Sequence, residues 1–203
     1  TGHAIYAARD LIHEDFIIIN GDDFYGRDAY EVAAKYIKSL PAGSKGKYAN
    51  VGFKISNTMT ENGSVKRGVL FEDENHNINN LIESSVERNA NKEIVCTPLE
   101  GAEPFTTNED QPVSMNLFVF NKDLMNHLSE KFPVWLEKHI NEPKSEFLIP
   151  SIVDELVKEN KASLKLLHTD SVWFGVTYKE DKPGVVKALK ELVGKGEYKE
   201  GLY

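Results

Sequence analysis

The 203-residue sequence contains a single cysteine, Cys96, and no apolar run that approaches the length of a membrane span. One cysteine excludes an internal disulfide framework and any zinc site built from paired cysteines. Because a helix needs about 20 consecutive apolar residues to cross a bilayer, the sequence predicts no membrane partner. It also shows no charged and apolar leader, so we expect a cytoplasmic protein.

Positive charge is scarce as well: the sequence has 24 Lys and Arg residues and 32 Asp and Glu residues, which gives a formal net charge of -8. Binding to a nucleic-acid backbone needs clustered Lys and Arg side chains, so the sequence predicts no nucleic-acid partner. It contains no Walker A or GxGxxG element, no histidine pair at metal-ligand spacing and no serine in a nucleophile elbow. Phosphate loops of those kinds, zinc sites and covalent catalysis are therefore not predicted.

The most informative stretch that is present, FIIINGDDFYG, covers residues 16–26. Phe16 to Ile19 form a continuous apolar run, which is typical of a strand covered on both faces in a parallel sheet. Asp22 and Asp23 follow directly, and ligands of open α/β sheets bind at the carboxyl ends of strands. Two carboxylates there suit Mg2+, with Asp22 as the better ligand. From the residues alone, a pair that only caps a turn is an equally good explanation.

The rest of the sequence predicts alternating helices and strands within one domain, residues 1–203. Apolar positions recur at helical spacing over residues 1–12 and 28–40, after 121, from 150 and from 183 to 194. Strand-like runs lie on both sides of Asn62-Gly63 and at 78–82, and we expect these runs to pair antiparallel. Another lies at 113–120, with shorter ones at 93–97, 163–167 and 171–174. Residues 84–112 are otherwise polar and predict a loop-rich excursion. These patterns indicate a mixed α/β sheet with a β-rich insertion.

Two adjacent segments, TGHAIYAARDLI and FIIINGDDFYG, closely resemble the central part of the sugar-phosphate nucleotidyltransferases. The resemblance continues through RGVLFEDENHNINNLIE, VSMNLFVF, SEFLIPSIVDELV and VWFGVTYKEDKPGVVKAL, and it covers essentially the whole chain. It implies the Rossmann-like mixed-sheet sandwich that this family shares with the GT-A glycosyltransferases. The family's Gly-rich signature loop would precede residue 1, so we expect a domain that lacks the first strands and is N-terminally incomplete.

The resemblance also implies an activity. The protein would transfer a nucleoside monophosphate from a nucleoside triphosphate to a sugar 1-phosphate and release pyrophosphate, with Mg2+ as cofactor. Asp22 would be the catalytic residue that binds the metal. Nucleotide-binding roles would fall on Thr1, Gly2, His3, Gly21 and Asp23. Glu83 and Asn116 would contact the sugar, although a surface carboxylate and a solvated strand residue are the plain alternatives for these two.

Three departures from the family pattern bear on this expectation. The loop that holds the triphosphate is absent, so we expect the isolated chain to be inactive. Gly175 stands where relatives carry a second metal-binding aspartate. Ser84 and Ser85 stand where relatives often carry Lys-Pro, so either Lys66, Arg67 or another cation compensates, or the activity differs.

Two other functional classes stay open. A GT-A glycosyltransferase would use the same acidic residues to hold Mn2+ and a nucleotide sugar, and a non-catalytic relative would bind a nucleotide or sugar phosphate without turnover. Relatives that activate phosphocholine share the pattern, so the acceptor is not fixed. Uncovered sheet edges would favour a homo-oligomer.

Overall fold

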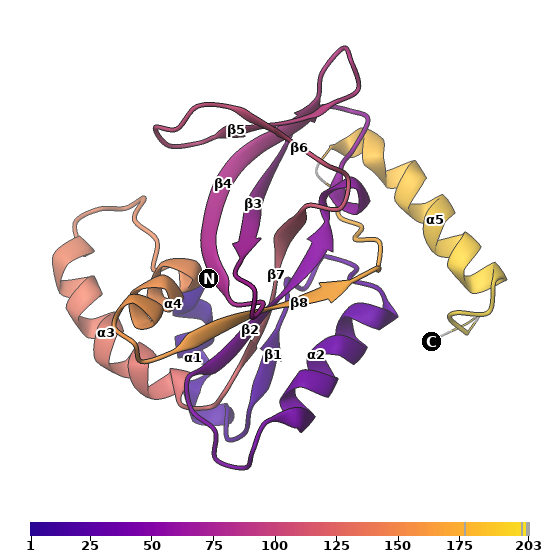
Figure 1. The fold of residues 1–203 in the computed structure, drawn as a ribbon. Coiled ribbons are helices and arrows are strands. Elements are labelled where there is room, and N and C mark those ends of the chain that lie inside the picture. Colours follow the sequence, from indigo (N-terminus) through magenta and orange to yellow (C-terminus); the bar gives the residue numbers. More distant parts are fainter. Residues whose placement is uncertain (177, 200, 202–203) are drawn as a thin grey trace.

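The computed structural model describes residues 1–176, 178–199 and 201, and it shows a sheet of eight strands flanked by helices (Figure 1). The strands are β1 (Phe16–Ile18), β2 (Lys47–Lys54), β3 (Val65–Glu72), β4 (Ile78–Arg88), β5 (Ile94–Pro98), β6 (Phe105–Thr107), β7 (Pro112–Phe120) and β8 (Ser163–Thr169). The helices are α1 (Gly2–Ala7), α2 (Arg27–Ser39), α3 (Leu124–His139), α4 (Ile149–Lys158) and α5 (Lys182–Gly194), with short 3-10 helices at Arg9–Leu11, Ile55–Thr58 and Lys179–Asp181. None of the described helices is long and apolar enough to cross a bilayer.

The strand order is β6-β5-β4-β3-β7-β2-β8, and β1 pairs with β7 outside this path. Only β2 and β8 run parallel among the paired strands, so the sheet is mixed as predicted. The antiparallel strands β3 and β4 curl away from the centre and carry β5 and β6 with them (Figure 1). These four strands are the β-rich part of the fold.

Helices cover both faces of the central strands, and the alternation within β7 explains why. Its residues Val113, Met115, Leu117 and Val119 lie in the core that also contains Ala29 and Ala33 of α2. Its residues Phe118 and Phe120 lie in the second core, which is built with α1, α3 and α4. The alternation predicted for residues 113–120 is confirmed, and it places β7 between two apolar layers. Helix α2 lies on one side of β7, and α1, α3 and α4 lie on the other (Figure 1).

The prediction of a parallel first strand is wrong. β1 runs antiparallel to β7, with Phe16 opposite Phe120 and Ile18 opposite Phe118. Its three residues are only partly buried, and Ile19 just beyond it is 44% exposed. Ile17 packs on one core and its two neighbours on the other, so both faces require apolar side chains whichever way the partner strand runs.

Three further expectations differ from the structure. Residues 84–112 contain more strand than expected, because β4 continues to Arg88 and β6 pairs antiparallel with β5, the strand predicted at 93–97. Residues 171–174 form no strand and contribute one bridge, between Phe24 and Phe174. The runs on either side of Asn62-Gly63 do not pair with each other; β2 and β3 both pair with β7 instead. Turn residues identify a reversal of the chain, but they do not identify the partner strand.

Candidate functional site

The sheet divides at the central strand β7, and we call this division the fork. β2 pairs with one edge of β7 along its length. On the other edge, Ser114 pairs with Gly68 of β3, whereas Phe118 pairs with Ile18 of β1. β1 and β3 therefore part from each other across residues 115–117, and the polar groups of this segment face a gap between two strands.

Asn116 lies at the centre of the fork in an unusual backbone conformation. Its φ of 62° is in the left-handed region, which non-glycine residues seldom adopt and asparagine tolerates better than most. The β2 and β7 register shifts at the same place, because the two steps from Asn50 to Gly52 oppose four steps from Phe118 to Ser114. Two extra residues keep the alternation of side chains intact while the strand bulges. Such bulges and strained positions are frequent beside binding sites.

A cleft of about 210 Å³ opens at this fork. Three of the predicted site residues line it, namely Asp23, Glu83 and Asn116. Lys66 and Arg67 line it as well, so the two cations considered as replacements for the family lysine both reach the predicted sugar side. The predicted residues in this cleft are therefore up to 93 positions apart in the sequence.

Gly68 forms the floor of the cleft and was not predicted. It lies opposite Glu83 in β4 and opposite Ser114 in β7. A Cβ atom on Gly68 would stand 3.2 Å from Glu83 Oε1, so the carboxylate rests directly over the bare backbone. Desolvation in this setting raises the pKa of the Glu83 carboxyl. A glycine inside a strand pattern is the sequence signal that could have identified this position.

A second hollow, of about 660 Å³, adjoins the cleft and shares Asn20 and Asn116 with it. It runs along the apolar flank of β1 and is lined by Thr1, Gly21 and Asp22. The Asp22 carboxylate is exposed and has no hydrogen-bond or ion-pair partner among the residues that the structure describes. Three residues predicted for the nucleotide side thus share this hollow, whereas Asp23 lies in the neighbouring cleft with Glu83 and Asn116.

Asp23, in contrast to Asp22, is engaged in a hydrogen-bond network. Asn20 Nδ2 donates to Asp23 Oδ2 at 2.9 Å, and the Tyr25 hydroxyl lies 3.3 Å from the same oxygen. That hydroxyl donates to the Met115 carbonyl at 2.9 Å, which ties the loop after β1 to the fork. Burial raises the pKa of Tyr25 above its ordinary value, so the hydroxyl keeps the proton that this network uses. Asp23 is therefore suited to positioning the loop, and Asp22 to binding a ligand.

The two cations of the cleft also differ in whether other protein groups already engage their charge. Arg67 is 7% exposed, and its guanidinium donates to both the carbonyl and the hydroxyl oxygen of Thr58 and lies 4.9 Å from the ring centre of Trp173. Burial lowers the pKa of Arg67 to about 10, and the negative charge of Asp23 opposes this shift, so the side chain stays positive at neutral pH. Lys66 is exposed and forms no ion pair in the described part of the chain. Lys66 is the cation that remains available to a ligand.

The structure shows what replaces the missing aspartate at position 175. A Cβ atom on Gly175 would stand 2.2 Å from Cη2 of Trp173 and 3.0 Å from Asp23 Oδ1. The indole ring thus occupies the space that a side chain at position 175 would need. A carboxylate there would also lie beside the carboxylate of Asp23.

Two residues predicted for the nucleotide side lie apart from both hollows. The backbone N–H of Gly2 donates to the Phe147 carbonyl at 2.8 Å, and Gly2 is buried at the start of α1. His3 stacks on Phe132, with ring centres 4.8 Å apart and planes 8° from parallel. These contacts give both residues a packing role, and their proposed contact with a nucleotide stays a prediction.

Gly2→Ala is expected to destabilise the protein by about 1–3 kcal/mol, because the new Cβ would stand 2.7 Å from the Phe147 carbonyl oxygen. The matched control is Gly184→Ala in α5, where a Cβ meets nothing within 4 Å. At that open helical position, alanine should be neutral or stabilising by up to about 1 kcal/mol. Urea unfolding followed by circular dichroism measures both. Equal effects of the two substitutions would contradict the packing role of Gly2.

No family model and no curated protein sequence matches this chain. Solved structures do share its fold. A protein from Bacillus anthracis assigned as a glucose-1-phosphate thymidylyltransferase, crystallised in complex with sucrose, is similar with a TM-score of 0.55 and 12% sequence identity. A CTP:phosphocholine cytidylyltransferase from Streptococcus pneumoniae is similar with a TM-score of 0.51 and 7% identity.

The similarity extends over most of this chain, 94% for the first structure and 93% for the second. It covers 61% and 63% of those two proteins, so the chain spans less than two thirds of their length. At such low sequence identity the comparison establishes the fold alone. The nucleotidyltransferase-like mixed α/β fold predicted from the sequence is confirmed.

Proposed function

We propose that this chain contributes the nucleotide and acceptor sites of a nucleotidyltransferase, which transfers a nucleoside monophosphate to a sugar 1-phosphate or a similar phosphorylated acceptor. The observation that carries the proposal is the pair of adjoining hollows at the fork of the sheet. One presents the free carboxylate of Asp22 and the other the free ammonium of Lys66, with Asn116 lining both. The fold shared with a thymidylyltransferase and a cytidylyltransferase supports the same reaction class.

Asp22 fits the Mg2+ ion that such a reaction uses. Mg2+ commonly binds one or two protein carboxylates and completes its shell with water and substrate phosphates. An exposed carboxylate without a protein partner, next to a hollow that can hold the nucleotide, meets this requirement. The ion would neutralise charge that develops on the phosphate oxygens.

The remaining residues would align the acceptor. In the proposed reaction an acceptor phosphate oxygen attacks the α-phosphorus, a new P–O bond forms, and the bond to the departing pyrophosphate breaks in line. The attacking oxygen is already anionic, so no general base is required. Lys66 would hold the acceptor phosphate, while Glu83 and Asn116 would orient its polar groups. Alignment and charge neutralisation supply most of the rate enhancement in phosphoryl transfer.

Calorimetric titration of the 203-residue chain with nucleoside triphosphates and nucleotide sugars, with and without Mg2+, tests the proposal. We expect Mg2+ to strengthen triphosphate binding, and a sugar phosphate to bind without Mg2+ through the Lys66 side. In a longer chain that contains these residues, pyrophosphate release and nucleoside diphosphate release, followed in parallel, distinguish nucleotidyl transfer from glycosyl transfer. If Mg2+ changes the affinity for none of the nucleotides, the role proposed for Asp22 is contradicted.

A second candidate is ligand binding without turnover. It is favoured by one observation, that Trp173 fills the space beside Gly175 in which a second metal-binding carboxylate would lie. If nucleotide and sugar phosphate both bind and no product forms in a longer chain that contains these residues, this second function is the correct one.

A further inference from the structure

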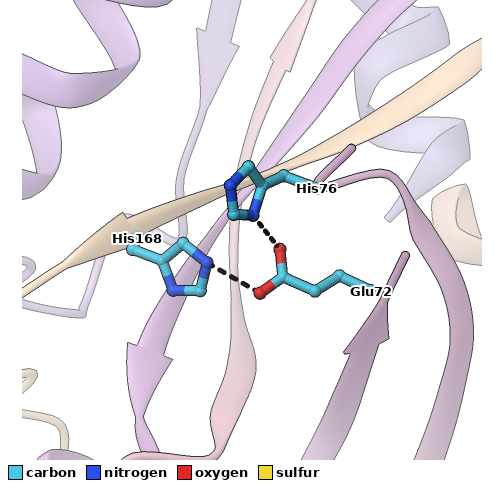
Figure 2. Close-up of side chains that lie close together, drawn as sticks. All are labelled: Glu72, His76 and His168. Atoms are coloured by element: carbon cyan, nitrogen blue, oxygen red, sulfur yellow. Dashed lines mark hydrogen bonds and ion pairs between the residues drawn. The ribbon is translucent and has the colours of Figure 1, made fainter. Parts of the chain in front are cut away.

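A separate cluster of metal-binding side chains lies at the far end of the β3–β4 hairpin, where the sequence predicted no metal site. Glu72 is the last residue of β3, His76 lies in the turn that follows, and His168 belongs to β8 (Figure 2). Glu72 Oε2 lies 2.8 Å from His76 Nδ1, and Glu72 Oε1 lies 2.9 Å from His168 Nε2. One ligand atom from each residue falls within 4.8 Å of the others.

We infer that Glu72, His76 and His168 form a binding site for a zinc-like transition-metal ion. Two imidazoles and one carboxylate are a common zinc ligand set, and imidazole nitrogen disfavours Mg2+ and Ca2+. Ligand atoms of a tetrahedral zinc lie roughly 3.4 Å apart, as follows from bond lengths of about 2.0–2.2 Å. The two close contacts go to different oxygens of Glu72, and the three ligand atoms lie within 4.8 Å of one another. Side-chain shifts of up to roughly 1.4 Å would therefore bring the three ligand atoms to the spacing that a zinc ion requires.

The backbone holds the three ligands in place before any ion binds. Asp73 Oδ1 accepts the N–H groups of Asn75 and Asn77, each at 2.8 Å, and so fixes the turn. The turn is joined to β8, because the N–H of Leu166 donates to the His76 carbonyl at 2.8 Å. His76 itself has a φ of 59°. A non-glycine residue keeps this conformation only where its surroundings impose it, and here the conformation directs its ring toward Glu72 (Figure 2).

The site is open to solvent on one side. The side chains of His76 and His168 are 59% and 51% exposed, and Glu72 is 25% exposed. Glu72 and His168 also line a hollow of about 570 Å³. Three protein ligands with an open fourth position are typical of zinc sites that retain water or bind a further ligand.

This site is distinct from the proposed Mg2+ site. The hollow beside His168 shares no lining residue with either hollow at the fork. A bound ion would clamp the hairpin turn to β8, and the same hairpin carries Gly68 and Glu83 of the acceptor cleft nearer its other end. The inference does not depend on the proposed function.

Calorimetric titration of the untagged, metal-free chain with ZnCl2 tests the inference. We expect one zinc ion per chain, a rise in the unfolding temperature with zinc, and neither effect with MgCl2. His168→Gln, Glu72→Gln and His76→Asn should each weaken zinc binding about 100-fold or more. Asparagine is chosen at position 76 because it tolerates a positive φ.

The matched control is His139→Asn. His139 Nδ1 lies 2.6 Å from Glu142 Oε2, so this residue also forms a His–Glu pair, but it belongs to no three-ligand cluster among the described residues. Its substitution should leave zinc affinity unchanged. Zinc binding that survives His168→Gln, or that is lost equally in the His139 variant, would overturn the inference.

A measurement on the unsubstituted protein avoids any question of whether the variants fold. Co2+ substitutes for zinc, and its visible absorption bands are intense in four-coordinate sites and weak in six-coordinate ones. We expect intense bands that appear with one equivalent of Co2+ and disappear when ZnCl2 is added. Bands no stronger than those of the aqueous ion, or bands that zinc does not displace, would overturn the inference.

Discussion

Asp22→Asn is expected to remove the Mg2+ dependence of nucleoside triphosphate binding, and to weaken binding in the presence of Mg2+ roughly 100-fold. The substitution keeps the size of the side chain and deletes its charge. Asp22 is exposed and has no hydrogen-bond or ion-pair partner in the described part of the chain, so its charge contributes little to the fold. Titration calorimetry at matched Mg2+ concentrations gives the affinity, and thermal unfolding verifies that stability is unchanged.

Two further variants show whether the effect belongs to Asp22 itself. Asp10→Asn removes another exposed carboxylate, whose one ion-pair partner among the described residues is Arg9 at 3.6 Å, and should change neither affinity nor Mg2+ dependence. Asp23→Asn disturbs the contacts with Asn20 and Tyr25 and should lower stability together with affinity. If Asp22→Asn and Asp10→Asn behave alike, Asp22 is not a metal ligand and the proposed nucleotide site is wrong.

The position of Asp22 could be predicted because local patterns determine it. A continuous apolar run identified β1, and the polar residues after it could lie only at the end of that strand. The alternation of residues 113–120 identified β7 and its two covered faces for the same reason. Neither inference needed the identity of the partner strand.

The fork could not be predicted, because it depends on which strands meet. Whether β1 and β3 share an edge of β7 is decided by contacts between residues about 50 to 100 positions apart, and periodicity carries no information about them. The sequence pattern also does not reveal the bulge at Asn116, since two extra residues leave the alternation of apolar side chains along the strand unchanged. His168 meets Glu72 across a separation of 96 residues, and so the metal-ligand cluster escaped a search for closely spaced histidines.

The sequence also did not indicate which of the two cations in the cleft is exposed to a ligand. The family resemblance implied that Lys66, Arg67 or another cation replaces a missing lysine or that the activity differs, and the structure brings Lys66 and Arg67 to the cleft. Their adjacent positions in β3 point to opposite faces, however, because side chains alternate along a strand. One is buried under Trp173 and the other is exposed. Which of two neighbouring residues is free to bind a ligand follows from the strand's faces rather than from its composition.

That difference predicts opposite phenotypes for two neighbouring substitutions. Arg67→Met should lower the free energy of unfolding by about 2–4 kcal/mol, because it leaves the buried Thr58 carbonyl without its donor and removes the guanidinium from the Trp173 ring. Lys66→Met should leave the urea unfolding midpoint unchanged and weaken binding of a sugar phosphate about tenfold or more, as expected for loss of a charge-assisted hydrogen bond.

Lys35→Met, on the exposed face of α2, is the control for removal of a surface charge and should alter neither stability nor binding. Arg67→Met should therefore change stability, whereas Lys66→Met should change affinity. If Arg67→Met spares stability, the contacts with Thr58 and Trp173 contribute little, and Arg67 becomes available as the phosphate ligand. If Lys66→Met spares affinity, the acceptor phosphate does not bind in this cleft, because Lys66 is the one cation there whose charge the described residues leave unengaged.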